Sequence, residues 1–559
     1  FGLPEVNVGL VPGVGGSQRL PRLVGLESAV EIACQGKLVS ADKLAALGGL
    51  DQVTNGDLRQ SAREFLGDDP TRPTPVSRRD TPFVADDFFD LKAKELKKRA
   101  KGQQSPLHNL KALEWSLEPF EVGQPKERAL HLNLRDTAES RALRHAFFAE
   151  RNVAKPASIK GGIARDISKI AIVGGGLMGA GIAASCLGGG FAVTIIEQTE
   201  KAADQTSARV ADLIDGGVKR GKISVPSRDA QMARLYCQSD YAAAADCDLA
   251  IEAVFEDLAV KKAVFTNLSK HMPDDAILAT NTSYLDPLEI FDGVKNPSRC
   301  IGLHFFSPAH VMKLLEIVKT PSTSPEVLAT GFALGRKLRK TSVLSGICDG
   351  FIGNRMLAAY RREADYLLAD GALPYQIDAA MRAFGMPMGP YELQDLTGLQ
   401  IAWANRKRQA STRPEGERYV TIADQLCDLG RFGQRAGKGW FRYEQGQRSP
   451  MRDALVKGLV ERFSQAHGIT RRSFSDQDIA DRLMAVLANE GARIVEEGIA
   501  ENAEAVDIVK IHGYGFPRWR GGPMQYANEI GWDKTAEIMK KVADESPNSW
   551  GLATKVAES

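Results

Sequence analysis

Short apolar runs alternate with longer amphipathic segments through the middle of the chain. The runs are KIAIV (169–173), AVTII (192–196), DLAIEAVF (248–255), AILAT (276–280) and CIGLHFF (300–306). Continuous apolar runs of this length are typical of parallel strands buried on both faces, and the segments between them are long enough for helices. The alternation predicts a doubly wound, Rossmann-like α/β sheet over residues 161–345.

After residue 345 the strand pattern ends and helical periodicity continues to the end of the chain. NRMLAAYRREADYLLADGA, followed by GMPMGP, is similar to RLMAVLANEGARIVEEGIA, followed by GYGFPRWRGGP. We therefore predict two related all-α domains, at 346–450 and 451–559, that pack face to face. The alternative is a chance similarity between amphipathic helices.

The chain before residue 161 has a different organisation. Residues 1–75 begin with a strand-like segment and a Gly-rich turn, and they are predicted as part of one further domain. A polar, Pro-rich stretch at 70–82 and KPASIKGG at 155–162 are predicted linkers. The charged, helix-periodic sequence between them makes 76–160 a helical linker region, and its charge runs are interpreted as a solvated face.

Composition narrows the possible functions. A chain of 559 residues is too long for a single hydrophobic core. Its net charge of +2 gives no general electrostatic basis for binding nucleic acid. No apolar run approaches the ~18 residues of a transmembrane segment, and no metal site is predicted. The seven cysteines form no CxxC pair, which indicates free thiols in a reducing compartment.

A glycine-rich sequence follows the first apolar run and begins a helical segment. In the GxGxxG frame its residues are Gly174, Gly176, Leu177, Met178 and Gly179. The glycines allow a tight turn, close approach to a pyrophosphate and close packing of helix on strand. Glu197 ends the second run, where a carboxylate accepts hydrogen bonds from the ribose hydroxyls and repels a 2′-phosphate. The pattern predicts that NAD is bound in preference to NADP.

Polar residues end two later strand runs. Asn281 and Ser283 follow AILAT, at the edge where open α/β sheets bind ligands. His304 follows CIGL, and Glu316 lies within the next apolar run. A lone histidine beside aromatic residues is more often a core residue, but this one has a candidate carboxylate partner. A carboxylate that fixes the imidazole tautomer supports a general base, which the oxidation of an alcohol needs.

Residues 168–450 resemble the L-3-hydroxyacyl-CoA dehydrogenase family through the ordered motifs GGGLMG, EAVFEDLAVKKAVF, NTS, HFFSPAHVMKLLEIV and DGFIGNRML. The resemblance implies that His304 is the base, that Glu316 is its partner and that Ser283 binds the 3-oxygen. It implies that Asn354 positions the substrate. Further predicted cofactor contacts are Glu256, Lys261 and Asn281, although Glu256 and Lys261 are also consistent with a surface charge pair.

The first residues, FGLPEVNVGLVPGVGGSQRLPRLVG, resemble the second half of the crotonase (enoyl-CoA hydratase) family. The second catalytic glutamate then falls on Glu5. The first glutamate and the oxyanion hole are expected before Phe1, in sequence that this chain lacks. The predicted fold is therefore an α/β multidomain protein: a partial crotonase fold, a Rossmann-like sheet and two helical dehydrogenase domains.

The order of these parts resembles the bifunctional enzymes of fatty-acid β-oxidation, both peroxisomal and bacterial. That resemblance implies acyl-CoA thioester substrates and a thiolase subunit as a further partner. Because the chain ends KVAES and not in an SKL-like signal, the bacterial cytoplasm is the expected location, with the peroxisome as the alternative.

Two other functions fit parts of the pattern. A β-hydroxyacid dehydrogenase also joins a nucleotide-binding sheet to a helical domain, but that chemistry usually employs a lysine base. A non-catalytic module that binds NAD or acyl-CoA, or a scaffold that docks a thiolase, needs no intact catalytic residues. The pairing of His304 and Glu316 with Ser283 favours the 3-hydroxyacyl-CoA dehydrogenase over both.

Overall fold

The computed structural model describes residues 1–68, 73–80 and 83–559, and these residues form two compact units. The first unit contains residues 1–147 with the short segments 383–387 and 517–521. The second contains residues 148–382, 388–516 and 522–559. Of the predicted linker at 70–82, residues 70–72 and 81–82 lie outside the described residues.

The described part of the first unit is helical. Its helices are α1 (Gly16–Ala29), α2 (Ala41–Ala46), α3 (Leu58–Leu66), α4 (Phe88–Ala100), α5 (Ser105–Glu114), α6 (Phe120–Leu134) and the greater part of α7 (Ala138–Asn152). The predicted strand-like start is wrong: Pro4–Val8 form a 3₁₀ helix, because Pro4 occupies its first position and its fixed φ suits a helical turn. The helical periodicity predicted before residue 152 is confirmed by α4 to α7.

The Gly-rich turn of the first unit is held by a buried carboxylate. Glu127 on α6 accepts hydrogen bonds from the backbone N–H groups of Gly15 (2.6 Å) and Ser17 (2.9 Å) at the beginning of α1. These donors have no partner within the helix, and the negative charge also complements the helix dipole. Burial raises the pKa of Glu127, although the hydrogen bonds from Ser17 and Gly15 oppose that change.

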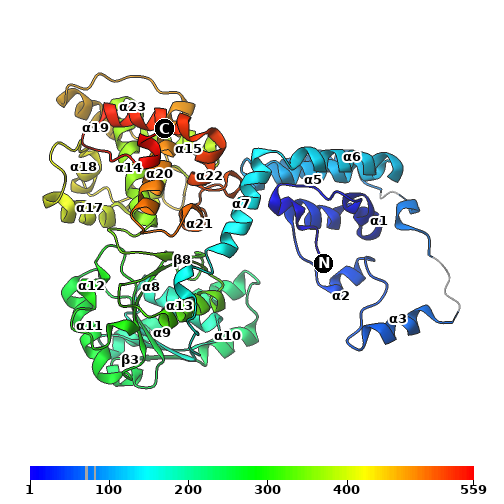
Figure 1. Ribbon diagram of the computed structural model, residues 1–559, viewed down its shortest axis with the longest axis horizontal. Helices are drawn as coiled ribbons and strands as arrows, with labels where there is room; N and C mark the ends of the chain where they lie inside the picture. Colours follow the sequence, from blue (N-terminus) through cyan, green and yellow to red (C-terminus); the bar gives the residue numbers. More distant parts are fainter. Residues whose placement is uncertain (69–72, 81–82) are drawn as a thin grey trace. The chain divides into compact units, whose positions relative to one another are not determined.

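The second unit contains a β-sheet with helices around it (Figure 1). The sheet has eight strands in the order β3-β2-β1-β4-β5-β6-β7-β8. The strands are β1 (Lys169–Val173), β2 (Ala192–Ile196), β3 (Leu235–Gln238), β4 (Leu249–Glu252), β5 (Ile277–Thr280), β6 (Cys300–Phe305), β7 (Leu314–Val318) and β8 (Thr341–Ser345). The five apolar runs correspond to β1, β2, β4, β5 and β6. The first six strands have the order of a dinucleotide-binding sheet, which confirms the predicted fold.

Helices cover both faces of this sheet. One core includes residues of α8 (Leu177–Gly188), α9 (Glu200–Lys219) and α13 (Pro325–Lys337), and the other includes residues of α11 (Leu258–His271) and α12 (Pro287–Ile290). α10 (Val225–Met232) precedes β3. The edge strand β3 alternates between partly buried and exposed residues, so it lacks the apolar run of a central strand.

One pair of neighbouring strands departs from the parallel arrangement. β7 runs antiparallel to β6, whereas every other neighbouring pair in the sheet is parallel. The connection at 306–313 is too short to cross back over the sheet, which a parallel neighbour would require. The chain therefore turns and returns beside β6.

The helices after β8 form two related copies. The first is α14 (Gly353–Asp370), α15 (Pro374–Phe384), α16 (Pro390–Thr397), α17 (Leu399–Arg408) and α18 (Ile422–Asp428); the second is α19 (Ala454–Ala466), α20 (Asp476–Glu496), α21 (Ala503–Tyr514), α22 (Pro523–Ile530), α23 (Trp532–Glu545) and α24 (Thr554–Ala557). Arg355 contacts Glu490 at 2.6 Å, and Arg482 contacts Glu363 at 2.7 Å. In each copy the acid follows the arginine by eight positions, so the two ion pairs are reciprocal and the predicted duplication is confirmed.

A second matched contact shows the same duplication. Asp378 accepts hydrogen bonds from the backbone N–H groups of Tyr391 and Glu392 at the start of α16, and Asp507 accepts them from Met524 and Gln525 at the start of α22. An acidic side chain from the preceding helix, α15 or α21, thus binds the N-terminus of the following helix in both copies.

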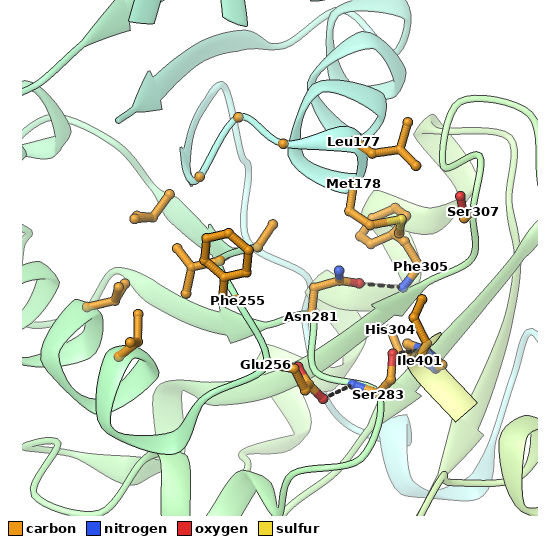
Figure 2. Close-up of a pocket in the computed structure, with 18 of the residues that line it drawn as sticks. Leu177, Met178, Phe255, Glu256, Asn281, Ser283, His304, Phe305, Ser307 and Ile401 are labelled. Atoms are coloured by element: carbon orange, nitrogen blue, oxygen red, sulfur yellow. Dashed lines mark hydrogen bonds between the residues drawn. The ribbon is translucent and has the colours of Figure 1, made fainter. Parts of the chain in front are cut away.

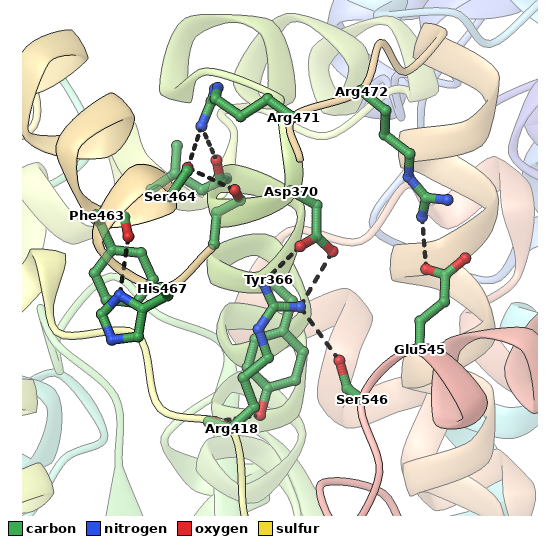
Figure 3. Close-up of polar contacts among 12 residues, drawn as sticks. Tyr366, Asp370, Arg418, Phe463, Ser464, His467, Arg471, Arg472, Glu545 and Ser546 are labelled. Carbon is green, nitrogen blue, oxygen red and sulfur yellow. Dashed lines mark hydrogen bonds and ion pairs between the residues drawn. The ribbon is translucent and has the colours of Figure 1, made fainter. Parts of the chain in front are cut away.

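Polar contacts also join the end of α14 to the second copy (Figure 3). The Arg471 guanidinium donates to the carbonyl oxygens of Leu368, Gly371 and Ala372, where a helix C-terminus leaves acceptors unpaired. Within the second copy, the neighbouring Arg472 pairs with Glu545 at 2.6 Å. The Arg471 contacts stabilise the packing of the two copies.

The cysteines and the helices add two further observations. All seven cysteines are free thiols. Within residues 1–68, 73–80 and 83–559, no helix is both long enough and apolar enough to cross a membrane.

Candidate active site

The antiparallel pair β6–β7 places a histidine directly opposite a glutamate. His304 on β6 is the register partner of Glu316 on β7, and the imidazole Nδ1 lies 2.7 Å from Glu316 Oε2. Both side chains are buried. The second oxygen of Glu316 accepts a hydrogen bond from the backbone N–H of Gly353 at 2.9 Å, so both oxygens of the carboxylate are hydrogen-bonded. An acceptor at Nδ1 favours the tautomer that leaves Nε2 unprotonated.

The other imidazole nitrogen points to a serine. His304 Nε2 lies 3.2 Å from the Ser283 hydroxyl, which follows the end of β5. Glu256 holds this loop by accepting hydrogen bonds from the Thr282 hydroxyl and from the backbone N–H groups of Ser283 and Tyr284. Burial opposes the ionisation of Glu256, but Lys261 and these three hydrogen bonds outweigh burial and lower its pKa.

Asn354 at the start of α14 receives a hydrogen bond from the second helical copy. The Tyr514 hydroxyl donates to Asn354 Oδ1 at 2.8 Å, and the Tyr514 ring contacts Phe306 edge-on. Phe306 in turn lies against the His304 ring, with centroids 4.5 Å apart. Because Oδ1 of Asn354 is engaged, its Nδ2 group remains the donor that can serve a ligand.

A cavity of about 1150 Å³ is lined by Glu256, Ser283, His304, Phe306 and Asn354, among others (Figure 2). Leu177 and Met178 reach it from the beginning of α8, while Ser283, His304 and Ile401 lie together elsewhere on its wall (Figure 2). The cavity is therefore shared between the carboxyl edge of the sheet and the first helical copy. Such an edge is where α/β sheets bind nucleotide ligands.

The glycine-rich loop fits a dinucleotide pyrophosphate. Gly174 has φ +93°, a conformation that favours glycine. A Cβ on Gly179 would lie 1.8 Å from the carbonyl oxygen of Gly174, so only glycine allows α8 to pack this closely. A Cβ on Gly176 would meet no atom within 4 Å, which leaves open space over the N-terminus of α8. The loop thus presents backbone N–H groups to an anion without obstruction.

Glu197 lies at the end of β2 on the wall of the same cavity. Its Oε1 accepts hydrogen bonds from the Gly175 N–H (2.8 Å) and the Thr206 hydroxyl (2.9 Å). Arg209 donates to the Gly175 carbonyl oxygen and also lines the cavity. A carboxylate fixed at this position suits a ribose diol and disfavours a 2′-phosphate.

The remaining predicted cofactor residues differ in their placement. Asn281 lines the cavity, and its Oδ1 accepts a hydrogen bond from the Phe305 N–H at 2.8 Å (Figure 2). Lys261 does not line it: its ammonium group is buried between Glu252 (2.6 Å) and Glu256 (3.3 Å). Lys261 thereby shapes the site by holding Glu256, and the alternative of a surface charge pair does not apply to this buried lysine.

Glu5 belongs to the first unit. It lies in the 3₁₀ helix Pro4–Val8, and its Oε2 is buried without a hydrogen-bond partner among the described residues. An unpaired buried carboxylate oxygen is costly and is typical of a functional group.

The sequence analysis assigns no role to three residues that lie in the cavity or contact its lining: Phe306, Arg361 and Tyr514. Phe306 belongs to the motif HFF and Tyr514 to the motif GYGFPRW, so both lie within motifs that the sequence analysis quotes. Their contacts depend on packing between segments far apart in the chain, which spacing along the sequence does not encode.

Three known families match parts of the chain. Residues 169–348 match the NAD binding domain of 3-hydroxyacyl-CoA dehydrogenase. Residues 350–443 and 479–558 match the C-terminal domain of the same enzyme, once in each helical copy. Residues 1–67 match the enoyl-CoA hydratase/isomerase family. The fold and the site therefore define an NAD-binding 3-hydroxyacyl-CoA dehydrogenase that is joined to part of a hydratase.

Two curated relatives match nearly the whole chain. The peroxisomal bifunctional enzyme of Danio rerio is 38% identical over 97% of this chain and 78% of its own length. The glyoxysomal fatty acid β-oxidation multifunctional protein MFP-a of Brassica napus is 36% identical over 95% of this chain and 75% of its own length. The chain belongs to this family of bifunctional hydratase/dehydrogenase enzymes of fatty-acid β-oxidation.

A solved structure agrees with this assignment. The 3-hydroxybutyryl-CoA dehydrogenase of Escherichia coli K12 superposes with a TM-score of 0.62 at 25% identity, over 70% of this chain and 98% of the bacterial one.

Proposed function

We propose that this chain oxidises (3S)-3-hydroxyacyl-CoA to 3-oxoacyl-CoA, with His304 as the general base. The observation that carries the proposal is the hydrogen-bonded series Ser283–His304–Glu316, in which Ser283 and His304 line the cavity and Glu316 is buried behind His304. Ser283 binds the 3-oxygen, and Asn354 positions the substrate beside the base. Glu256 acts indirectly, because it holds the loop that carries Ser283.

The proton path follows from the same contacts. With Nδ1–H donated to Glu316, the lone pair at Nε2 accepts the proton of the 3-hydroxyl group. The Glu316 carboxylate then stabilises the positive charge on the imidazole, while the Gly353 N–H keeps that carboxylate from rotating. The Ser283 hydroxyl donates a hydrogen bond to the 3-oxygen and keeps its proton, which stabilises the negative charge that develops on that oxygen.

The cofactor assigned to this site is NAD, which when bound accepts the hydride from C3. The loop Gly174–Gly179, with Leu177 and Met178, would hold its pyrophosphate, and Glu197 would bind its ribose. Asn281 and Glu256 line the same cavity. Lys261 is proposed to support cofactor binding through Glu256, because its ammonium group contacts that carboxylate.

The hydratase activity is proposed from residues 1–67, which match the enoyl-CoA hydratase/isomerase family. We propose that Glu5 is one of the two glutamates that add water across a 2-enoyl-CoA double bond. Its buried, unpaired Oε2 supports that role.

We propose that the chain has five domains, at residues 1–75, 76–160, 161–345, 346–450 and 451–559. The relatives quoted above are peroxisomal and glyoxysomal, so the bacterial cytoplasm remains a prediction that fractionation of the source cells would test. Association with a thiolase subunit is likewise a prediction, tested by co-purification of the full-length protein.

The central test is the rate of NADH formation from (3S)-3-hydroxybutyryl-CoA. We expect His304→Ala to lower kcat by at least ~10²-fold, because a general base contributes that much. His271→Ala, an exposed histidine at the end of α11, is the matched control and should keep full activity. An unchanged rate in His304→Ala would overturn the proposal. Oxidation of free 3-hydroxybutyrate at a similar rate would favour a β-hydroxyacid dehydrogenase.

A further inference from the structure

One stripe of α14 forms part of the cavity wall. Asn354, Leu357 and Arg361 are spaced three and four positions apart and all line the cavity. This spacing places them on one face of a helix. Arg361 lies about 10 Å along the helix axis from Asn354, at a rise of ~1.5 Å per residue. The cavity wall thus carries a guanidinium group on the residue two helical turns beyond Asn354.

Arg361 has no counter-charge in contact with it. Among the described residues it makes no hydrogen bond, ion pair or ring contact, and its buried Nε has no partner. The adjacent Arg362, by contrast, donates to the Ser549 carbonyl oxygen and lies over the Trp550 ring. Burial of a charge is costly unless the charge is paired, so an unpaired guanidinium needs an explanation.

The titratable groups around Arg361 do not neutralise its positive charge. The phenols of Tyr284 and Tyr514 lie within its electrostatic reach, and burial raises the pKa of both, so they stay neutral. Asp365 also acts on Arg361, but burial raises the pKa of this carboxyl to about 7. Arg406 adds a like charge, and burial with Arg406 lowers the pKa of Arg361.

A second basic side chain is buried in the same surroundings. Lys510 on α21 is buried, and its ammonium group lies over the Tyr514 ring, 4.3 Å from the centroid. Burial, with the charge of Arg361 as a further cause, lowers the pKa of Lys510 to about 7. Among the described residues neither basic side chain has a paired carboxylate. Arg361, with a smaller contribution from the partly charged Lys510, produces a positive potential at this end of the cavity, and such a potential attracts an anion.

We propose that Arg361 is an anion-binding residue of the substrate site and that it binds a negatively charged group of the acyl-CoA. The group is either a phosphate of the CoA or a carboxylate on the acyl chain. Both are oxyanions that a guanidinium binds through paired hydrogen bonds. This inference rests on the proposed function, since it takes the ligand of the cavity to be an acyl-CoA.

The test compares wild type, Arg361→Gln and Arg361→Lys on three substrates. These are (3S)-3-hydroxybutyryl-CoA, the same acyl group on pantetheine, which lacks phosphates, and a 3-hydroxyacyl-CoA with a terminal carboxylate. Arg336→Gln is the matched control, because Arg336 is exposed on α13 and does not line the cavity. KM and kcat are measured separately, and thermal unfolding is followed for each variant.

Binding of a CoA phosphate predicts that Arg361→Gln raises KM about tenfold or more for both CoA thioesters and leaves the pantetheine thioester unchanged. Binding of an acyl carboxylate predicts the same increase for the carboxylated substrate alone. Arg361→Lys should retain most of the affinity in either case. An equal change for all three substrates, or no change, would overturn the anion site.

Stability separates this role from a structural one. Removal of an unpaired, partly buried cation should leave the Tm of Arg361→Gln equal to or above that of wild type. A large drop in Tm would show that Arg361 supports the fold and would overturn the proposal. If wild type forms no NADH from any substrate, the proposed function fails; if wild type is active and Arg361→Gln matches it, only the anion site fails.

Discussion

The Tyr514 hydroxyl donates a hydrogen bond to Asn354 Oδ1 at 2.8 Å, across 160 positions of sequence. The contact joins the end of α21, in the second helical copy, to the start of α14, in the first. A Cβ on Gly353 would lie 2.5 Å from the Tyr514 hydroxyl, so glycine at 353 allows this approach. The second copy thus completes the substrate side of the site formed by the first.

Tyr514→Phe removes this hydrogen bond and keeps the ring. We expect kcat/KM for 3-hydroxybutyryl-CoA to fall about fivefold, the effect of ~1 kcal/mol, because Asn354 loses its fixed orientation. The matched control is Tyr366→Phe, which removes a hydroxyl that donates to the Arg418 carbonyl oxygen outside the cavity. In a double-mutant cycle with Asn354→Ala the two effects should not add. Additive losses would show that Tyr514 acts independently of Asn354.

Glu316→Gln tests the orientation of the base. The amide preserves size but removes the negative charge opposite His304 Nδ1 and presents a donor to it. We expect kcat to fall by at least ~10²-fold, while the Kd for NAD, measured by fluorescence titration, changes little. A variant with normal kcat would mean that the carboxylate does not stabilise the imidazolium.

Two glycines of the dinucleotide loop should respond differently to alanine. Gly179→Ala places a Cβ 1.8 Å from the Gly174 carbonyl oxygen, so we expect a lower Tm and weak NAD binding. Gly176→Ala meets no protein atom within 4 Å and has φ −61°, so its Tm should equal that of wild type. Its Kd for NAD should nevertheless rise, because the methyl group occupies the approach to the pyrophosphate. Equal Tm values for the two variants would contradict the packing argument.

Lys510→Met should stabilise the protein at neutral pH. The lowered pKa of about 7 means that the folded state binds fewer protons than the unfolded state between about pH 7 and 10.5. The free energy of unfolding therefore rises with pH across this window in wild type, and below about pH 7 the full cost of charging Lys510 remains. The methionine variant should show a flatter pH dependence and a Tm at pH 7 that is higher by at least ~2 °C. Parallel profiles for the two proteins would argue against a depressed pKa.

Much of the nucleotide-binding half could be predicted from the sequence. The turn from β1 into α8 uses glycines that are neighbours in the chain, and their conformations are set by local sterics. Central strands produce apolar runs because both faces are buried. The duplication of the helical domain could be predicted because each copy keeps its pattern of apolar and polar positions. The edge strand β3 and the antiparallel direction of β7 were not predicted, since half-exposed strands and short reversals leave weak patterns.

What the sequence by itself determined is therefore the local part: the glycine turn, the carboxylate of Glu197 at a strand end, the central strands and the residue types for base chemistry. Only the tertiary structure decided which of these residues meet. The antiparallel register sets His304 against Glu316, and packing of the two helical copies brings Tyr514 to Asn354. It also buries Lys261 between two glutamates and leaves Arg361 unpaired in the cavity. The physical reason is that periodicity encodes which face of an element is buried, whereas contacts between distant elements depend on how those faces pack.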